Sequence, residues 1–187
     1  MTFPTDGGYE KVEARQVDFD NLDGDSKEFE GADSAFCCIG TTRGKAGKAG
    51  FIKVDHDYVL NSAKLLKDSN CLDFHLLTSR GSNANSWFLY PKTKGQVEEA
   101  VKSLGFDRLT IYRPGLLMCD RAESRTGEKL IRWVAGWFQQ PTSWSIPTSM
   151  VAAAMVATSL TNIESGGPSS TILEHSDIAK IAQESNL

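Results

Sequence analysis

Three short apolar runs alternate with two amphipathic segments, and this order constrains the fold more than any other feature of the sequence. The apolar runs cover residues 34–40, 71–79 and 109–112, and each is followed by small polar residues, by glycine or by Arg-Pro-Gly. A continuous apolar run of this kind is typical of a strand buried on both faces of a parallel sheet. The segments between the runs, 51–67 and 90–104, carry apolar residues at helical spacing. The order predicts an α/β fold with a parallel sheet and right-handed crossovers.

The rest of the chain predicts further elements with a less regular pattern. Residues 12–19 fit a short strand that leads into a loop and a short helix. Residues 40–50, GTTRGKAGKAG, are rich in glycine and lysine and predict a loop. Beyond the third run we expect two helices and then a strand followed by a helix, at residues 127–138, 148–160 and 171–183. No repeat or linker interrupts this order, so we expect a single domain over residues 1–187.

Composition and charge exclude several classes of protein. The 187-residue chain is long enough to bury a core without disulfide bonds or metals. A net charge of −4 does not favour nucleic acid or anionic membranes. No apolar run approaches the roughly 20 residues that span a bilayer, and residues 1–14 lack the pattern of a secretory signal. The cysteines form no Cys-x-x-Cys pair, as expected of reduced thiols, so we expect a soluble protein of the cytoplasm or the nucleus.

The ends of the expected strands are the places where chemistry is expected, because open α/β sheets bind ligands at the carboxyl ends of their strands. These ends are residues 40–43, 78–81 and 113–115. Residues 40–46 do not form a nucleoside triphosphate loop, since the spacing is one residue short and no Ser or Thr follows the lysine. The segment can still approach a cofactor through its glycines, and Arg43, Lys45 and Lys48 can face a phosphate. A solvated surface loop is the alternative.

Tyr90 and Lys94 are separated by one helical turn, so their side chains share a face of the expected helix. A lysine ammonium stabilises the phenolate of a neighbouring tyrosine. Such a tyrosine can serve as a general acid toward a carbonyl oxygen while hydride arrives from a nicotinamide. The hydroxyl of Ser79 or Thr78 would hold the same oxygen, and the lysine can bind a ribose. A chance pairing of the two residues is the alternative.

The three histidines do not indicate a metal site. His56, His75 and His175 are scattered and match no pair of cysteines, so we expect no metal. His75 lies between Phe74 and Leu76 in an apolar run, which favours a structural role.

Several strings of the sequence together resemble the Tat-interacting, CC3-type protein family, whose members are atypical short-chain dehydrogenases/reductases. The strings are CCIGTTRGKAG, VDHDYVLNSAKLLK, LLTSRGS, FLYPKTKGQVE and DRLTIYRPGLLMCDRAESR, and the resemblance extends from about Val17 to the C-terminus. It implies a Rossmann fold that binds NADP(H) and acts on a carbonyl or alcohol substrate.

The resemblance also implies roles for individual residues. Tyr90, Lys94 and either Ser79 or Thr78 match the catalytic residues of the superfamily. The implied cofactor contacts are the backbone of Ile39 and Gly40, Asp18 near the adenine, Tyr90 and Lys94, and Leu117 and Arg125 toward the nicotinamide and the substrate.

The sequence departs from the family in its first part. It contains no G-x-x-G-x-x-G, the loop that cradles the pyrophosphate after the first strand. We therefore expect a Rossmann-like, doubly wound parallel sheet that lacks the first βαβ unit, in a chain incomplete at its N-terminus. Residues 34–40 would then form an edge strand, which is an aggregation hazard. Asp55 falls near a position where many superfamily members carry an active-site asparagine.

Two functions follow from these observations. The first is an NADP(H)-dependent oxidoreductase, active as a monomer or a dimer. The alternative is a non-catalytic regulatory protein, because the family is described as acting in apoptosis and nuclear import. In that case the implied partners are importin-β and transcription regulators. The sequence names no substrate.

Overall fold

A parallel sheet of four strands forms the centre of the computed structural model, which describes residues 11–118, 144–163 and 167–185. The strands lie in the order β1 (Ser34–Cys37), β2 (Asp73–Leu77), β3 (Arg108–Arg113) and β6 (Ser169–Glu174). All three neighbouring pairs are parallel, with no slip in register along any of them. The predicted α/β fold with a parallel sheet is therefore confirmed.

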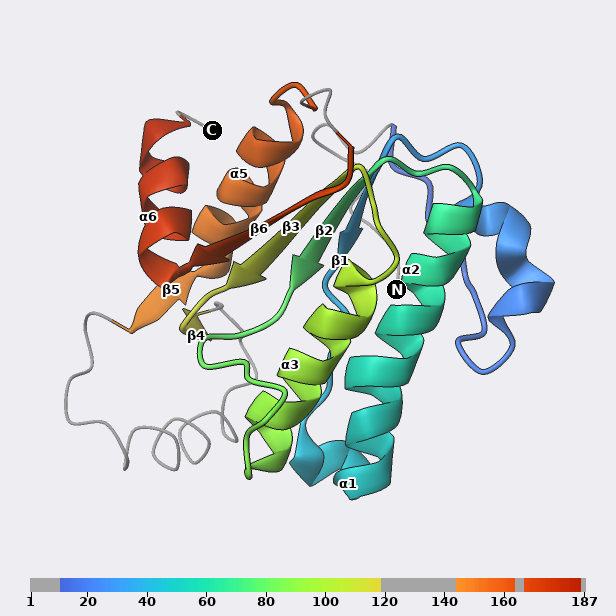
Figure 1. Cartoon of the computed structure of the whole chain (residues 1–187), viewed down its shortest axis with the longest axis horizontal. Helices are drawn as coiled ribbons and strands as arrows, with labels where there is room; N and C mark the ends of the chain where they lie inside the picture. Colours follow the sequence, from blue (N-terminus) through green and yellow to red (C-terminus); the bar gives the residue numbers. More distant parts are fainter. Residues whose placement is uncertain (1–10, 119–143, 164–166, 186–187) are drawn as a thin grey trace.

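Helices cover both faces of this sheet, which gives the doubly wound arrangement expected from the sequence (Figure 1). One face packs against α2 (Val59–Asp68) and α3 (Leu89–Lys102), and the other against α5 (Thr148–Ser159) and α6 (His175–Glu184). The helices after β2 and β3 bring the chain back to the amino end of the sheet, as a parallel strand order requires.

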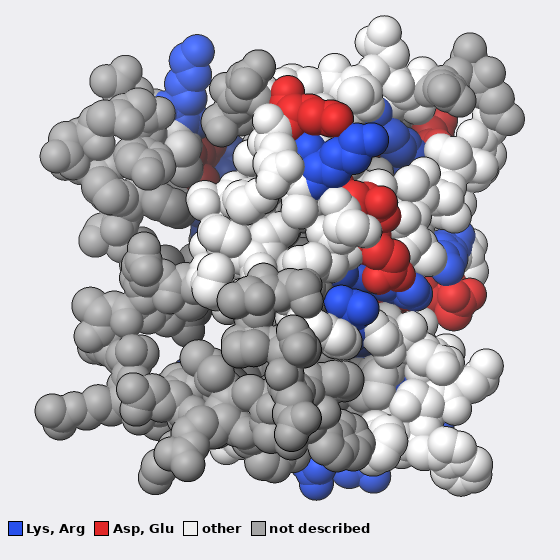
Figure 2. All heavy atoms as spheres, turned by 90° about the vertical axis from the view of Figure 1, so that its left-hand side faces the viewer, with Lys and Arg blue, Asp and Glu red and all other residues white. Residues whose placement is uncertain are grey.

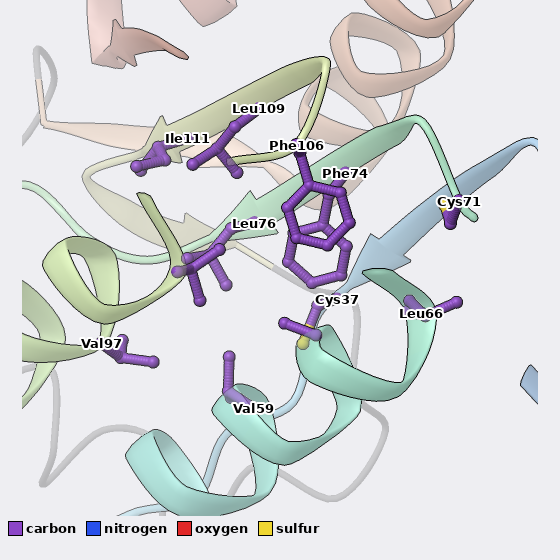
Figure 3. Packing of buried hydrophobic residues seen from close by; sticks show 12 residues of the cluster. Cys37, Val59, Leu66, Cys71, Phe74, Leu76, Val97, Phe106, Leu109 and Ile111 are labelled. Atoms are coloured by element: carbon purple, nitrogen blue, oxygen red, sulfur yellow. The ribbon is translucent and has the colours of Figure 1, made fainter. Parts of the chain in front are cut away.

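The larger core lies between the sheet and α2 and α3. Alternate residues of β2 and β3 point into it, and the rings of Phe74 and Phe106 stack with their centroids 4.8 Å apart (Figure 3). From the helices, the core receives Val59, Ala63, Leu66, Val97 and Val101. Their spacing of three or four residues places them on one side of each helix.

Strand β1 differs from the expectation of a strand buried on both faces. It lies at one edge of the described sheet, so Phe36 is 45% exposed and stacks on the ring of His75 at 4.6 Å. Cys37 points into the core, and burial raises the pKa of its thiol to about 11, which keeps it protonated at neutral pH. Cys38 is exposed, so the pair does not belong to the core as a unit.

Two short segments also fold differently from the expectation. Residues 12–19 contain no strand: Val17 and Phe19 line a cavity together with Phe36 and Cys37 of β1, but no described strand pairs with this segment. The short helix that follows is a 3₁₀ helix, η1 (Leu22–Phe29). In the segment expected as a loop, helix α1 (Arg43–Ile52) begins after the extended residue Thr42, whose carbonyl accepts the amide of Ala46 at 3.1 Å.

Helix α1 continues without a break into a π-helical segment, η2 (Lys53–Tyr58), and then into α2. A π-helix places one more residue in each turn than an α-helix does, and it changes the direction of the side chains it carries. The buried residue of η2 is Asp55.

A second, two-stranded parallel sheet joins β4 (Leu116–Met118) to β5 (Ser145–Pro147). Gly115 is required at the start of β4, because a Cβ atom there would lie 2.0 Å from the carbonyl oxygen of Trp144. The expected helix at 127–138 and Cys119 lie outside the described residues.

Charged side chains on the face that carries α6 alternate in sign (Figure 2). Figure 2 shows acidic and basic groups next to one another there, with no broad patch of one sign. Within the described ranges, no helix has the length and hydropathy that crossing a bilayer requires.

Candidate functional site

Four elements meet at the carboxyl ends of β1 and β2 and supply the residues of the candidate site. They are the turn after β1, the π-helical segment η2, the loop after β2 and the first turns of α3. We name the group formed by Asp55, Ser79, Tyr90 and Lys94 the open cluster.

The strongest contact in the open cluster is an ion pair between Asp55 and Lys94. The ammonium nitrogen of Lys94 lies 2.7 Å from Oδ1 of Asp55, and the two side chains are only 7% and 2% exposed. The other oxygen, Oδ2, accepts the backbone amide of Thr41 at 2.8 Å. The pair therefore connects η2, α3 and the turn after β1, and removing either partner would leave a buried charge without its counter-ion.

Gly40 lies directly against this ion pair. A Cβ atom at Gly40 would lie 3.3 Å from Oδ1 of Asp55 and 3.8 Å from the ammonium of Lys94. The absence of a side chain at this position therefore lets the turn after β1 come close to both charged groups.

Tyr90 lies at the second residue of α3 and is 49% exposed, which leaves its phenol accessible. Its ring stacks on the buried ring of Phe51 from α1, with centroids 5.7 Å apart. Pro91 follows within the first turn of the helix, where a missing amide hydrogen costs no helical bond. The proline and the stacked ring together restrict how the tyrosine can be oriented.

The two hydroxyl residues after β2 have different surroundings. The hydroxyl of Thr78 donates to Oε1 of Glu98 at 2.6 Å and lies 3.2 Å from the carbonyl oxygen of Tyr112. The Oγ atom of Ser79 is buried, and it has no hydrogen-bond partner among the residues that the structure describes. A buried hydroxyl without a partner is energetically costly, so Ser79 is a candidate to bind a ligand oxygen.

The loop between Ser79 and Tyr90 packs directly on α3. A Cβ atom at Gly95 would lie 2.1 Å from the backbone nitrogen of Ala84, so only glycine permits this approach. The amide of Asn83 donates to the carbonyl of Pro91 at 2.9 Å. The helix that carries Tyr90 and Lys94 therefore also supports the loop that begins at Ser79.

The other residues expected to bind a cofactor are less closely connected to the open cluster. Ile39 is half-buried and packs against the core, while Leu117 in β4 is 38% exposed. Asp18 lies in the exposed N-terminal segment, where its carboxylate accepts the amide of Asp20 at 2.9 Å. Arg125 lies outside the described residues.

The three cations expected near a phosphate, Arg43, Lys45 and Lys48, lie on α1 and are exposed. For the described part of the chain, no hydrogen bond or ion pair joins them to the open cluster. They are compatible with a solvated helix surface, which was the alternative for this segment.

A second group of polar side chains lies on the face of the sheet opposite α2 and α3, and we name it the closed cluster. It comprises the buried residues Asp73, His75 and Tyr112 and the partly buried residues Ser34 and Arg108. Asp73 accepts hydrogen bonds from Ser34 at 2.9 Å, from Nε2 of His75 at 2.8 Å and from Nε of Arg108 at 2.7 Å. The other ring nitrogen of His75 lies 2.8 Å from the Tyr112 hydroxyl.

The surroundings of Asp73 and Tyr112 in the closed cluster shift the pKa values of these two groups. Burial opposes ionisation of Asp73, but the hydrogen bonds from Arg108 and His75 outweigh it and hold the pKa of this carboxyl well below its usual range. Burial raises the pKa of Tyr112 to about 12, so its hydroxyl remains a donor. Every member has a partner, which favours the structural role expected for His75.

Two features of the open cluster fit a nicotinamide cofactor and a carbonyl substrate. The ammonium of Lys94 lies next to the glycine turn after β1, and an ammonium can donate a hydrogen bond to a ribose hydroxyl. The unpartnered hydroxyl of Ser79 and the exposed phenol of Tyr90 can each donate a hydrogen bond to a carbonyl oxygen. Across the described residues, no group of three or more His, Cys, Asp or Glu side chains could hold a metal ion.

Sequence reasoning missed the ion pair that holds Lys94. Asp55 stood out only as a departure from an expected asparagine, and it lies 39 positions before Lys94, so the pairing has no local signal. The position of Asp55 in a π-helix also has no marker in the sequence, although such segments are frequent at functional sites.

Comparison with known proteins identifies relatives in animals and fungi. No protein-family model matches the chain. The protein HTATIP2 of Rattus norvegicus is 44% identical over 187 residues, which is all of this chain and 76% of the rat protein. The mitochondrial protein fmp52-1 of Aspergillus oryzae is 35% identical over 157 residues, which is 78% of this chain and 66% of the fungal protein. The chain thus spans three quarters of the first relative and just under two thirds of the second.

Solved structures with the same fold have little sequence identity to this chain. MoeE5 in complex with UDP-glucuronic acid and NAD gives a TM-score of 0.63 at 12% identity, over 86% of this chain and 61% of MoeE5. The human epimerase family protein SDR39U1 with NADPH gives a TM-score of 0.52 at 13% identity, over 84% of this chain and 60% of that protein. These likenesses establish a Rossmann-type fold.

The relatives correct the expected location in the cell. A cytoplasmic or nuclear protein was expected from the composition and the cysteines, but several fungal relatives are named as mitochondrial. Charge and cysteine spacing do not distinguish one reducing compartment from another. The expectation of a cytoplasmic or nuclear protein is therefore wrong.

Proposed function

The chain belongs to the family of the Tat-interacting protein HTATIP2, and from this premise we propose that it is an NADP(H)-binding oxidoreductase of the short-chain dehydrogenase/reductase type. Its substrate would be a small carbonyl compound or the corresponding alcohol. The observation that carries the proposal is the buried, unpartnered hydroxyl of Ser79, next to the helix that presents Tyr90 and Lys94.

Each member of the open cluster has a separate task in this proposal. The phenol of Tyr90 donates a proton to the carbonyl oxygen during reduction, and takes it back during oxidation of the alcohol. The hydroxyl of Ser79 donates a hydrogen bond to the same oxygen and fixes its position, whereas the hydroxyl of Thr78 is already engaged by Glu98. Lys94 binds a ribose hydroxyl, and the cofactor supplies the hydride when bound.

Asp55 has two effects on Lys94 in this arrangement. It holds the ammonium in place through the 2.7 Å ion pair, and it balances the positive charge inside a buried site. The backbone of Ile39 and Gly40 lines the cofactor side, and Leu117 and Arg125 are assigned to the nicotinamide and substrate end. Preference for NADP(H) over NAD(H) is part of the proposal, with support from the solved structure of SDR39U1 with NADPH.

Cofactor binding and turnover of the Tyr90→Phe variant test the proposal. NADPH is expected to raise the melting temperature of the wild-type chain in a saturable manner, and titration calorimetry should give the same affinity. The Tyr90→Phe variant is expected to bind NADPH as the wild type does and to reduce carbonyl compounds at least about 100-fold more slowly. The matched control is Tyr58→Phe, which removes an exposed phenol bonded to Asp20 far along the chain from α3. Equal turnover by Tyr90→Phe and wild type would reject the assignment.

A second candidate function is favoured by the ion pair itself. The ammonium that a catalytic lysine uses is already bound by Asp55, so NADP(H) would serve as a structural ligand or a sensor. In this case the chain would be a regulatory protein acting in apoptosis or nuclear import, with importin-β or transcription regulators as partners. Capture of purified importin-β by both the wild type and Tyr90→Phe, without carbonyl reduction by either protein, would support this candidate. No capture would reject it.

A further inference from the structure

Glu98 is a buried acidic residue that the proposed reaction does not use. It lies on α3 one turn after Lys94, and it is fully buried. Its Oε1 atom accepts the hydroxyl of Thr78 at 2.6 Å and Nε of Arg113 at 3.1 Å, and its Oε2 atom accepts a second nitrogen of the same guanidinium. The carboxylate thus has a partner on β2 and a partner on β3.

The hydrogen bonds of Glu98 extend across the carboxyl end of the sheet. Arg113, at the end of β3, also binds Glu174 at the end of β6 at 3.1 Å. Thr78, directly after β2, is additionally bound through its amide to the carbonyl of Tyr112 at 2.8 Å. Charge-assisted hydrogen bonds of this type are short and directional. They therefore fix the position of α3 along its axis, relative to the strand ends, more closely than apolar packing does.

The position of α3 determines the geometry of the open cluster. Tyr90 and Lys94 are carried by α3 itself, while Ser79 is covalently next to Thr78, which Glu98 binds. The backbone beyond Ser79 is also held, because Ser82 donates through its hydroxyl to the carbonyl of Ser79 at 2.7 Å. A shift of α3 along its axis would therefore move the phenol relative to the hydroxyl that must meet it at one oxygen atom.

A contribution to stability alone does not account for this buried charge. Replacing a buried ion pair by well-packed apolar residues of similar volume is often neutral or stabilising. The approach of α3 to the loop at Gly95 and the bond from Asn83 to Pro91 already hold the helix against the sheet. What Glu98 adds is a fixed distance from α3 to the residue before Ser79.

We propose that Glu98 is a positioning residue: through Thr78 and Arg113 it sets the hydroxyl of Ser79 against the phenol of Tyr90. It touches neither the substrate nor the cofactor. This inference rests on the proposed oxidoreductase function for its kinetic consequences, and the contacts of Glu98 carry its structural part.

Three variants test the kinetic part against a matched control. Glu98→Met removes both polar contacts and keeps most of the volume, Glu98→Gln retains an acceptor for Thr78, and Thr78→Val removes only the hydroxyl. The control, Glu99→Gln, changes the neighbouring exposed carboxylate, which pairs with Lys102. The readouts are kcat and KM for carbonyl reduction, the Kd of NADPH from calorimetry, and the fraction of folded protein from circular dichroism.

Glu98→Met and Thr78→Val are expected to lower kcat about 10- to 100-fold, because a displacement near 1 Å has an effect of that order. The Kd of NADPH should stay within about twofold of wild type, and Glu98→Gln should recover most of the rate. A wild-type kcat per folded molecule in Glu98→Met and Thr78→Val would overturn the proposal, since a purely structural residue lowers only the amount of folded protein.

Amide hydrogen exchange separates this inference from the proposed function. Should the wild type reduce no carbonyl compound, the proposed function fails, while exchange in residues 80–88 still tests the contacts of Glu98. Faster exchange at Asn83 in Glu98→Met and Thr78→Val, but not in Glu99→Gln, supports the positioning role. Unchanged exchange at Asn83 in both variants overturns it.

Discussion

The structure contains two groups of polar side chains next to the same sheet, and they differ in how completely their hydrogen bonds are satisfied. In the closed cluster, Asp73, His75 and Tyr112 form a continuous series of hydrogen bonds, and Arg108 and Ser34 complete the set around Asp73. The open cluster contains the unpartnered hydroxyl of Ser79 and the half-exposed phenol of Tyr90.

Residue types alone would suggest the opposite assignment of roles. An Asp–His pair with a tyrosine resembles a catalytic relay, whereas a lone serine after a strand does not. The difference lies in the remaining capacity to bind a ligand. Every member of the closed cluster has a hydrogen-bond partner, whereas the hydroxyl of Ser79 in the open cluster has none among the described residues. A polar group without a partner is therefore the better indicator of function than residue type.

The largest expected effect separates the two clusters by stability. Asp73→Asn should lower the free energy of unfolding by about 3–5 kcal/mol, because it leaves Arg108 without its buried counter-charge and weakens the hydrogen bond to His75. The control is Asp107→Asn, which removes a half-exposed partner of Lys67 and should change stability by about 0.5 kcal/mol or less. Urea unfolding of both variants measures the difference.

The same substitution should change the acid limb of the stability curve. The pKa of Asp73 is lowered in the folded state, so its contribution is fully present above the pKa of an unfolded aspartate, about 4. It is lost as the pH falls below that value. Wild type should therefore lose stability more steeply than Asp73→Asn below about pH 4, and parallel curves would contradict the role of Asp73.

A smaller effect is expected for the alkaline limb. The pKa of Tyr112 is raised from 10 to about 12 in the folded state. Its contribution is therefore fully present below pH 10 and is lost as the pH rises to 12, which amounts to about 2–3 kcal/mol. Tyr112→Phe should show a correspondingly flatter dependence in denaturant titrations. Cys37 titrates in the same pH range in both proteins and contributes equally to both curves. An equal dependence of the unfolding free energy on pH in wild type and variant would therefore show that burial does not raise the pKa of Tyr112.

The two hydroxyls after β2 give the sharpest comparison, because they are adjacent in sequence. Thr78→Val should lower the free energy of unfolding by about 1–3 kcal/mol, since a donor to the buried carboxylate of Glu98 is lost. Thermal unfolding of the variant at neutral pH is the measurement. A neutral result would show that water or another group replaces the hydroxyl.

The smallest effect on stability is expected at Ser79. Ser79→Ala removes a hydroxyl without a described partner, so the free energy of unfolding should stay within about 0.5 kcal/mol of wild type. Carbonyl reduction should nevertheless fall about 100-fold, as on removal of one donor to a developing oxyanion. A stability loss as large as that of Thr78→Val, with unchanged turnover, would show that the hydroxyls of Ser79 and Thr78 have the same structural role.

The regular part of the fold could be predicted from the sequence because its signals are local. The strands at 73–77 and 108–113 and the helix at 89–102 lie within a few residues of the predicted ranges. Tyr90, Lys94 and Ser79 could be singled out because a strand end and a helix start are each marked within a few residues.

The missed features depend on contacts between distant segments. The pairing of Asp55 with Lys94 and of Thr78 with Glu98 joins residues 39 and 20 positions apart, and no local pattern encodes it. Residues 12–19 have strand-like composition but no described neighbour to pair with, so tertiary context overrides their propensity. The helix start at Arg43 was missed because glycine-rich sequences usually predict loops.

The π-helical segment η2 makes the pairing of Asp55 with Lys94 dependent on the number of residues in this helix. A π-helical turn accommodates one extra residue within an α-helix, so deleting one residue between Lys53 and Tyr58 would restore α-helical hydrogen bonding there and change the direction of the side chain at position 55. Such a deletion would withdraw the carboxylate from Lys94 without substituting any residue of the open cluster. Homologues that lack one residue in this helix would therefore have a lysine without its carboxylate partner, even where an aspartate is retained. The length of the helix, as well as the identity of residue 55, would distinguish the two kinds of homologue.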